Sequence, residues 1–315
     1  MKFAHLARWT PVRLDFSGPV PAVYWADLSS VRFAEPFFDQ TVTHWVAGHD
    51  ARPLVRTGLE ALVALDGEPS LEPAGMIFHV SRCGSTLVSR LLGTLPGVVV
   101  LAEAAPLNSL LGLDRLDDAT LVKIVRLLVR ALGRHRHGDE RRLVLKCTSW
   151  NIRRRAVLAA AFPETPWIWV QRDPVRVLAS LLAQPPGWLG LQGAPRWAAR
   201  RFGLDEAEIR GMSRTEFAAR VLGAMLEAAG TDPAGRLCVD YANLPDAVWQ
   251  RVAPHFGLDT DAAAIARMID ESRFDAKDPT GRVFTGDAAE RRPINDEMQE
   301  AARRFAEPGY SALTT

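Results

Sequence analysis

The sequence has few cysteines and no long apolar run. Its three cysteines, Cys83, Cys147 and Cys238, are scattered over 315 residues, too few and too far apart for a disulfide framework or a CxxC metal site. No apolar stretch reaches the roughly 20 residues of a membrane-spanning helix, and the first residues lack the apolar segment of a signal peptide. These absences predict a cytoplasmic protein without a transmembrane segment.

An excess of charge of one sign is also lacking. The chain has 38 basic and 37 acidic residues, a formal net charge of +1, so no binding to nucleic acid or to an acidic membrane is expected. Four of the basic residues are lysine, a bias that we ascribe to genomic base composition: Lys2, Lys123, Lys146 and Lys277. HExxH and EF-hand patterns are absent. The stretch GRHRHGDERR, residues 133–142, is expected to be a solvent-exposed loop, not a metal site.

From residue 75 onward, short apolar strands alternate with helices. Strands are expected at 75–80, 97–103, 142–146, 166–172 and 236–241, and helices from about Ser85 and at 119–133, 152–162 and 174–183. This alternation predicts an α/β fold with three layers, α/β/α, and a mostly parallel sheet.

Residues 1–72 are expected to form an N-terminal extension packed on the main domain, residues 73–315. This part of the chain is rich in aromatic residues and proline and contains no nucleotide-binding motif. The alternative is a lid whose aromatic side chains line an apolar groove for an acceptor. Those side chains would be Trp9, Trp25, Phe37, Phe38 and Trp45.

The stretch IFHVSRCGSTLVSRLL, residues 77–92, joins a strand to a helix through a turn of small residues. The backbone N–H groups and dipole at a helix start form an anion site, and Gly84 lets a phosphate approach the backbone closely. The P-loop pattern GxxxxGK[ST] fails twice, because His79 replaces its first glycine and Ser85 its lysine. Ordinary ATP or GTP hydrolysis is therefore disfavoured, and a turn without a ligand stays open as the alternative.

A second motif, WIWVQRDPVRVLAS at residues 167–180, places Arg172 at a strand end and Ser180 two helical turns later. Open α/β sheets bind ligands at the carboxyl ends of their strands. A guanidinium and a hydroxyl suit a second, separate phosphate. The alternative is that Arg172 pairs with Asp173 or caps a helix.

The two motifs together resemble the 5′-phosphosulfate loop and the 3′-phosphate motif of sulfotransferases that use 3′-phosphoadenosine 5′-phosphosulfate (PAPS). Weaker similarities in VVVLAEAAPLNSLL, LVLKCTSW and RLCVDYANLPDAV extend the resemblance over about residues 75–258. The chain resembles bacterial sulfotransferases, and the arginine in its loop is similar to that of the Golgi and tyrosylprotein type. Cys83 departs from the usual serine or threonine, and Tyr241-Ala242-Asn243 departs from a YED triplet.

The resemblance implies transfer of a sulfuryl group from PAPS to a hydroxyl or amine of a small-molecule or peptide acceptor, without a metal. It implies that Arg82 stabilises the leaving oxygen, that Glu103 is the general base and that Lys146 lies beside the sulfuryl group. The 5′-phosphate would be bound by Arg82, Cys83, Gly84, Ser85, Thr86 and Leu87, and the 3′-phosphate by Arg172 and Ser180. Residues 281–292 are a weak candidate for a further 3′-phosphate loop.

Alternatives stay open for single residues and for the whole chain. Glu103 can instead be a carboxylate at the start of a helix, and Lys146 a salt-bridged lysine at a strand end. The chain as a whole can instead be a P-loop small-molecule kinase or a non-catalytic nucleotide-binding relative. Residues 184–197 are expected to face the acceptor, whose identity, like the oligomeric state, does not follow from the sequence.

Overall fold

The structure, a computed structural model, describes residues 3–48, 53–278, 280–286 and 290–314. Five strands form one sheet in the order β5-β6-β4-β7-β8, and every neighbouring pair is parallel. Their bounds are β4 Pro73–His79, β5 Val98–Ala102, β6 Arg142–Lys146, β7 Trp167–Gln171 and β8 Arg236–Asp240. The predicted α/β fold with a mostly parallel sheet is confirmed.

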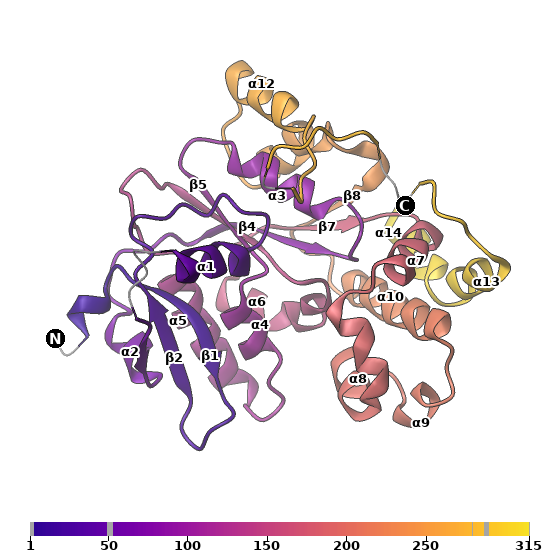
Figure 1. The fold of residues 1–315 in the computed structure, drawn as a ribbon, viewed down its shortest axis with the longest axis horizontal. Helices are drawn as coiled ribbons and strands as arrows, with labels where there is room; N and C mark the ends of the chain where they lie inside the picture. The colour runs from indigo at the N-terminus through magenta and orange to yellow at the C-terminus, as the bar shows by residue number, and fades with distance from the viewer. Residues whose placement is uncertain (1–2, 49–52, 279, 287–289, 315) are drawn as a thin grey trace.

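Helices cover both faces of this sheet (Figure 1). On one face lie α3 (Ser85–Gly93) and α12 (Ala262–Glu271), and on the other lie α4 (Ala105–Leu111), α5 (Asp118–Leu132) and α6 (Arg155–Ala161). A further group packs together on the right of Figure 1: α7 (Pro174–Ala183), α10 (Arg214–Gly230), α13 (Asp296–Phe305) and α14 (Glu307–Thr314). The shorter helical segments are η2 (Ser149–Arg154), η3 (Gly187–Gly193), α8 (Pro195–Phe202), α9 (Glu206–Ile209), η4 (Tyr241–Asn243), η5 (Val248–Val252) and α11 (Ala253–His255).

Local sequence signals explain where several of these elements begin and end. Helix α7 starts at Pro174, whose fixed φ suits the first helical position, and the Asp173 carboxylate accepts a hydrogen bond from Val175 N at 2.9 Å. Helix α5 is preceded by Asp117, which caps it in the same way, and ends before Gly133. The helix expected at 152–162 is shorter than predicted, because a 3₁₀ segment, η2, precedes α6.

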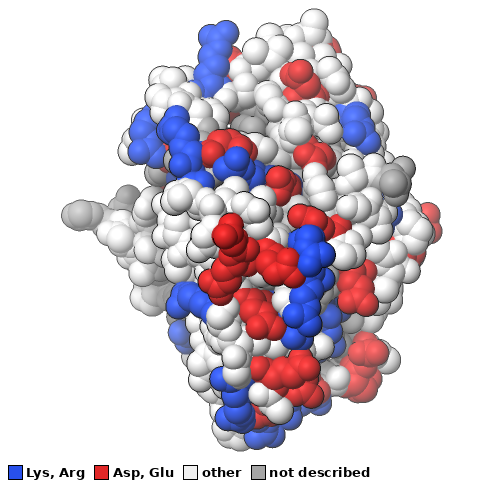
Figure 2. All heavy atoms as spheres, turned by 90° about the vertical axis from the view of Figure 1, so that its right-hand side faces the viewer, with Lys and Arg blue, Asp and Glu red and all other residues white. Residues whose placement is uncertain are grey.

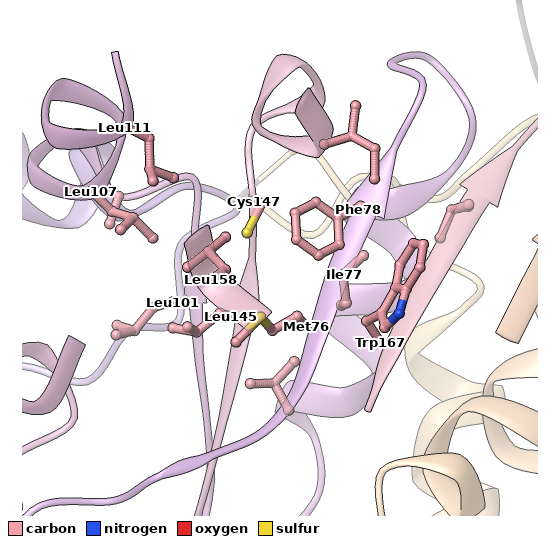
Figure 3. Close-up of a cluster of buried hydrophobic side chains, with 14 of the residues drawn as sticks. Met76, Ile77, Phe78, Leu101, Leu107, Leu111, Leu145, Cys147, Leu158 and Trp167 are labelled. Carbon is pink, nitrogen blue, oxygen red and sulfur yellow. The ribbon is translucent and has the colours of Figure 1, made fainter. Parts of the chain in front are cut away.

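An apolar core lies between the sheet and the helices α4 and α6. Figure 3 shows Leu107 and Leu111 of α4 and Leu158 of α6 gathered with Leu101 and Leu145 of the neighbouring strands. All five side chains are at most 4% exposed. An ionised side chain is costly in such surroundings, so the charged residues that follow the strands collect at the carboxyl edge of the sheet.

The N-terminal part of the chain forms a separate antiparallel sheet of three strands, in the order β1-β2-β3. Its elements are η1 (Ala4–Leu6), β1 (Thr10–Asp15), β2 (Ala22–Ala26), α1 (Phe38–Ala47), β3 (Val55–Thr57) and α2 (Glu60–Ala64). Trp25 and Phe38 are buried in the same hydrophobic core as the residues of the parallel sheet. These two aromatic side chains therefore pack in the interior and do not line a groove.

The segment 133–142 is only in part the solvent-exposed loop that we expected, with residues 138, 139, 141 and 142 exposed. Arg134, Arg136 and Glu140 are buried, and Arg134 donates to two backbone carbonyls of the N-terminal region. Burial alone would raise the pKa of Glu140, but hydrogen bonds from the backbone N–H groups of residues 136–138 lower it to about 2. The segment thus connects the N-terminal region to the main domain through hydrogen bonds. Across the described ranges, no group of three or more His, Cys, Asp or Glu side chains is placed to hold a metal ion.

The surface on the right of Figure 1, where α8, α9 and α13 lie, faces the viewer in Figure 2. Basic and acidic side chains are interleaved there, without a broad area of one sign. This agrees with the net charge of +1. In the part of the chain that the structure describes, no helix has the length and apolar character needed to cross a membrane.

Candidate active site

The candidate site lies at the carboxyl edge of the parallel sheet. Arg82 follows β4, Glu103 follows β5, Lys146 ends β6 and Arg172 follows β7. In the strand order β5-β6-β4-β7-β8, the chain runs from β4 to the edge strand β5 and later from β6 to β7, which lies on the other side of β4. Such a switch point is where open α/β sheets bind their ligands.

The loop after β4 contains three residues with positive φ. The values are 73° at Ser81, 51° at Arg82 and 82° at Gly84. Left-handed backbone is uncommon outside glycine and persists where the surrounding structure enforces it. Turns of this kind direct successive N–H groups into a concave anion site. Helix α3 starts directly afterwards without a side-chain cap on its first turn, so residues 85–87 present backbone donors to the same place.

The loop residues differ in what they offer to a ligand. Cys83 is fully buried, and burial raises the pKa of its thiol to about 11. Its side chain therefore packs in the core, and only its backbone faces the loop. A Cβ atom at Gly84 would lie 2.6 Å from Leu244 Cδ1 and 3.0 Å from Tyr241 Cδ2. Glycine is thus favoured there by the positive φ and required by the packing of Tyr241 and Leu244 on the loop.

Glu103, Lys146 and His79 form a cluster beside this loop, in which Lys146 and His79 are buried and the Glu103 side chain is 22% exposed. Lys146 Nζ donates to Glu103 Oε1, and His79 Nε2 lies 3.5 Å from the same oxygen. Because His79 Nδ1 accepts a hydrogen bond from Ser81 N at 3.0 Å, the neutral ring carries its proton on Nε2, facing the carboxylate. Lys146 therefore forms a salt bridge at the end of its strand, which was the alternative expected from the sequence. Its partner is Glu103, the residue predicted to be the general base. The ring of Phe37, from the N-terminal part, lies 4.9 Å from Lys146 Nζ.

The electrostatics of this cluster favour an ionised carboxylate. Burial alone would raise the pKa of Glu103, but the ammonium group of Lys146 and the His79 ring outweigh it and hold that pKa well below its usual range. Burial lowers the pKa of His79, so its ring is neutral at physiological pH.

A second cluster lies around Arg172. Arg172 and Ser180 are buried, at 5% and 4% exposure. Arg172 Nη2 and Arg176 both contact the carboxylate of Glu290, and Arg292 Nη1 donates to Ser180 Oγ at 2.6 Å. The Glu290 carboxylate thus contacts Arg172, which the sequence predicts to bind the 3′-phosphate.

Two contacts connect this cluster to the loop after β4. Arg172 Nη1 donates to the Arg82 carbonyl at 3.3 Å, and the Tyr241 ring lies 4.1 Å from the Arg172 guanidinium and against Gly84. The Arg82 side chain donates to the Gln184 carbonyl at 2.5 Å, where α7 ends. In the triplet Tyr241-Ala242-Asn243, the tyrosine ring therefore lies between the loop after β4 and the cluster around Arg172.

Three residues were not individually assigned to the site from the sequence: His79, Lys277 and Arg292. Arg292 lies in the weak candidate segment 281–292, of which residues 287–289 fall outside the described residues. Lys277 is exposed at the residue level, and partial loss of hydration together with the charges of Arg82 and Lys146 lowers its pKa, so its ammonium group is within electrostatic range of the loop. The rarity of lysine in the sequence was the signal that could have indicated Lys277, because two of the four lysines, Lys146 and Lys277, belong to this region.

Residues 184–197, expected to face the acceptor, form η3 and the start of α8. The ring of Trp188 is buried edge-to-face against Phe202, with the centroids 5.7 Å apart, whereas Trp197 is 59% exposed. One of the two tryptophans therefore serves packing. That the segment faces an acceptor stays a prediction.

No family model and no curated protein matches the chain. Among solved structures, it is similar to sulfotransferase STF9 from Mycobacterium avium, at 14% identity over 90% of this chain and 88% of that one, with a TM-score of 0.47. A sulfotransferase from Alicyclobacillus acidocaldarius matches at 15% identity over 77% and 94%, with a TM-score of 0.44. Mouse sulfotransferase SULT7A1, solved in complex with PAP, matches at 10% over 80% and 88%, with a TM-score of 0.36. At these values the likeness assigns no residue a role.

The depressed pKa of Glu103 predicts a pH-dependent contribution to stability. A carboxyl whose pKa falls below its usual 4.5 on folding stabilises the protein above that pH, and the contribution is lost as the pH falls. Glu103→Gln should therefore lower the free energy of unfolding more at about pH 7 than at about pH 3.5. Urea unfolding at both pH values measures this. Glu164→Gln, at an exposed position, is the control, and a difference that stays constant or widens in acid would contradict the prediction.

Proposed function

We propose that this protein is a sulfotransferase, which transfers a sulfuryl group from PAPS to a hydroxyl or amine of a small-molecule or peptide acceptor. The observation that carries the proposal is that the uncapped start of α3 and the arginine cluster around Arg172, both suited to an anion, are connected by a hydrogen bond. A donor with phosphates at both the 5′ and the 3′ position needs two such sites. A nucleoside triphosphate needs one, with a lysine that this loop lacks.

In this proposal the loop binds the 5′-phosphosulfate. The backbone N–H groups of residues 83–87 and the hydroxyls of Ser85 and Thr86 hold the 5′-phosphate. Arg82 stabilises the negative charge that develops on the bridging oxygen as the sulfur–oxygen bond breaks. Arg172 and Ser180, together with Arg292, bind the 3′-phosphate.

The acceptor oxygen or nitrogen attacks the sulfur in line with the leaving oxygen and gives up its proton to Glu103. A carboxylate with a low pKa is ionised and able to accept a proton, but it is a weak base. Lys146 can increase the basicity of Glu103, because a sulfuryl group bound beside Lys146 would draw the ammonium group away from the carboxylate. The loss of that partner raises the pKa of Glu103 as the reaction begins.

The test of the donor site is selectivity between two nucleotides. The protein should bind adenosine 3′,5′-bisphosphate at least about tenfold more tightly than adenosine 5′-monophosphate, because hydrogen bonds to charged groups contribute about 1.5–3 kcal/mol. Arg172→Ala should remove most of this difference and leave binding of the monophosphate unchanged. Isothermal titration calorimetry measures both, with Arg210→Ala, an exposed arginine paired with Glu206, as control. Equal affinity of the wild-type protein for both nucleotides would overturn the proposal.

The test of the chemistry is transfer of labelled sulfate from PAPS in an acceptor screen. Glu103→Gln should lower turnover about 10²- to 10⁴-fold, the usual contribution of a general base, while affinity for the bisphosphate stays the same. Full activity of this variant would refute the assignment of Glu103. No transfer by the wild-type protein to any acceptor would favour a non-catalytic nucleotide-binding relative.

Glu290 should compete with the 3′-phosphate, because its carboxylate contacts Arg172 and Arg176. Glu290→Gln should bind the bisphosphate about fivefold more tightly, which corresponds to the roughly 1 kcal/mol of a partly exposed ion pair. Affinity for the 5′-monophosphate should not change. Glu300→Gln, which removes the partner of Arg303, is the matched control. Unchanged or weaker binding of the bisphosphate to Glu290→Gln would show that no such competition exists.

A further inference from the structure

Glu103 has a backbone conformation that its surroundings must enforce. Its φ is 57°, and among the described residues other than glycine only Ser81 and Arg82 share a positive φ. Side chains alternate between the faces of a strand, so a continued strand would place Glu103 on the face of Leu101, which is buried in the core shown in Figure 3.

The register of the sheet places the partners of Glu103 on the opposite face. Lys146 pairs with Ala102 of β5 and with Ile77 of β4, and His79 is two residues beyond Ile77. Side chains of paired residues share a face, so Lys146 and His79 lie on the face away from Leu101. The left-handed turn therefore moves the Glu103 carboxylate from the core side to these two partners.

Two asparagines hold this turn by a chain of hydrogen bonds. Asn108 Nδ2 donates to the Glu103 carbonyl at 2.9 Å, and Asn151 Nδ2 donates to Asn108 Oδ1 at 2.8 Å. The direction of the chain is fixed, because a carbonyl can only accept, so Asn108 must present its amide nitrogen to Glu103 and its oxygen to Asn151. Asn151 is fully buried. The Glu103 N–H is held as well, since it donates to the Lys146 carbonyl at 2.7 Å.

We propose that Asn108 and Asn151 are positioning residues for Glu103, whose left-handed turn they fix so that the carboxylate lies beside Lys146 and His79. The inference rests on the proposed function, in which Glu103 accepts the proton of the acceptor. Neither asparagine touches the carboxylate. Both act through the backbone of Glu103, Asn108 from α4 and Asn151 from η2.

The first measurement separates turnover from binding. Asn108→Leu keeps the approximate volume of the side chain and removes both hydrogen bonds. It should lower kcat for sulfuryl transfer about 10- to 100-fold, as expected for a misplaced catalytic group, with an unchanged Kd for adenosine 3′,5′-bisphosphate. Asn151→Leu should act in the same direction. Thr165→Val is the matched control, because it removes a hydrogen bond to the Pro73 carbonyl at the other end of β4, and its kcat should not change.

The decisive measurement combines Asn108→Leu with Glu103→Gln. In the Glu103→Gln background, Asn108→Leu should lower the residual kcat no further, because the carboxylate that it positions is gone. A general loss of folded protein would instead lower activity equally in both backgrounds. That result would overturn the proposal.

Hydrogen exchange distinguishes a failure of this inference from a failure of the proposed function. Asn108→Leu should speed exchange of the Glu103 amide, while amides of β8 exchange as in the wild-type protein. If the wild-type protein transfers sulfate to no acceptor, the proposed function fails, and faster exchange at Glu103 still supports the positioning role. Unchanged exchange at Glu103 overturns that role whatever the activity.

Discussion

The candidate site depends on the parallel pairing of β4 with β6 on one side and with β7 on the other. Parallel strands end at one edge of a sheet. Arg82 and Arg172, which are 90 positions apart in the chain, are therefore brought into contact by the strand pairing itself. Register matters as much as direction. A slip of one residue in β6 would turn Lys146 to the other face of the sheet, into the apolar layer around Leu145 and Leu158. The burial of that layer therefore fixes where the ammonium group lies.

Backbone strain is concentrated at the same edge. The non-glycine residues with positive φ in the described ranges, Ser81, Arg82 and Glu103, all lie there, although they follow two different strands. His79 connects them, because its ring accepts a hydrogen bond from Ser81 N and faces the Glu103 carboxylate. One neutral imidazole therefore lies between the loop after β4 and the Glu103 carboxylate. Strain of this kind persists at functional sites because packing elsewhere supports it.

The regular part of the fold could be predicted from the sequence, whereas much of the site could not. The three inner strands, β4, β6 and β7, are buried on both faces and appear as apolar runs, and α7 has a proline at its start and an aspartate before it. Residues next to strand ends, such as Arg172, follow from the topology. Arg292 and Lys277 come from an irregular segment without periodicity, and Asn108 acts through hydrogen bonds between elements that no local pattern reports. The charged composition of residues 133–142 predicts exposure, but backbone carbonyls of the N-terminal part supply partners that only the tertiary structure provides.

Three cations of the site, those of Arg82, Lys146 and Arg172, are already engaged by other groups of the protein. Arg172 contacts Glu290, Lys146 contacts Glu103, and Arg82 donates to the Gln184 carbonyl. Binding of an anion is therefore an exchange of partners, in which the new attraction is offset by the contact that is lost. A phosphate monoester has a charge of about −2 and three acceptor oxygens, so it exceeds what one carboxylate offers to Arg172 and Arg176. A monocarboxylate ligand gains nothing in that exchange. In the proposed function, the internal carboxylate would make the second cluster selective for a phosphate over a monocarboxylate, a selectivity that two unpaired arginines would lack.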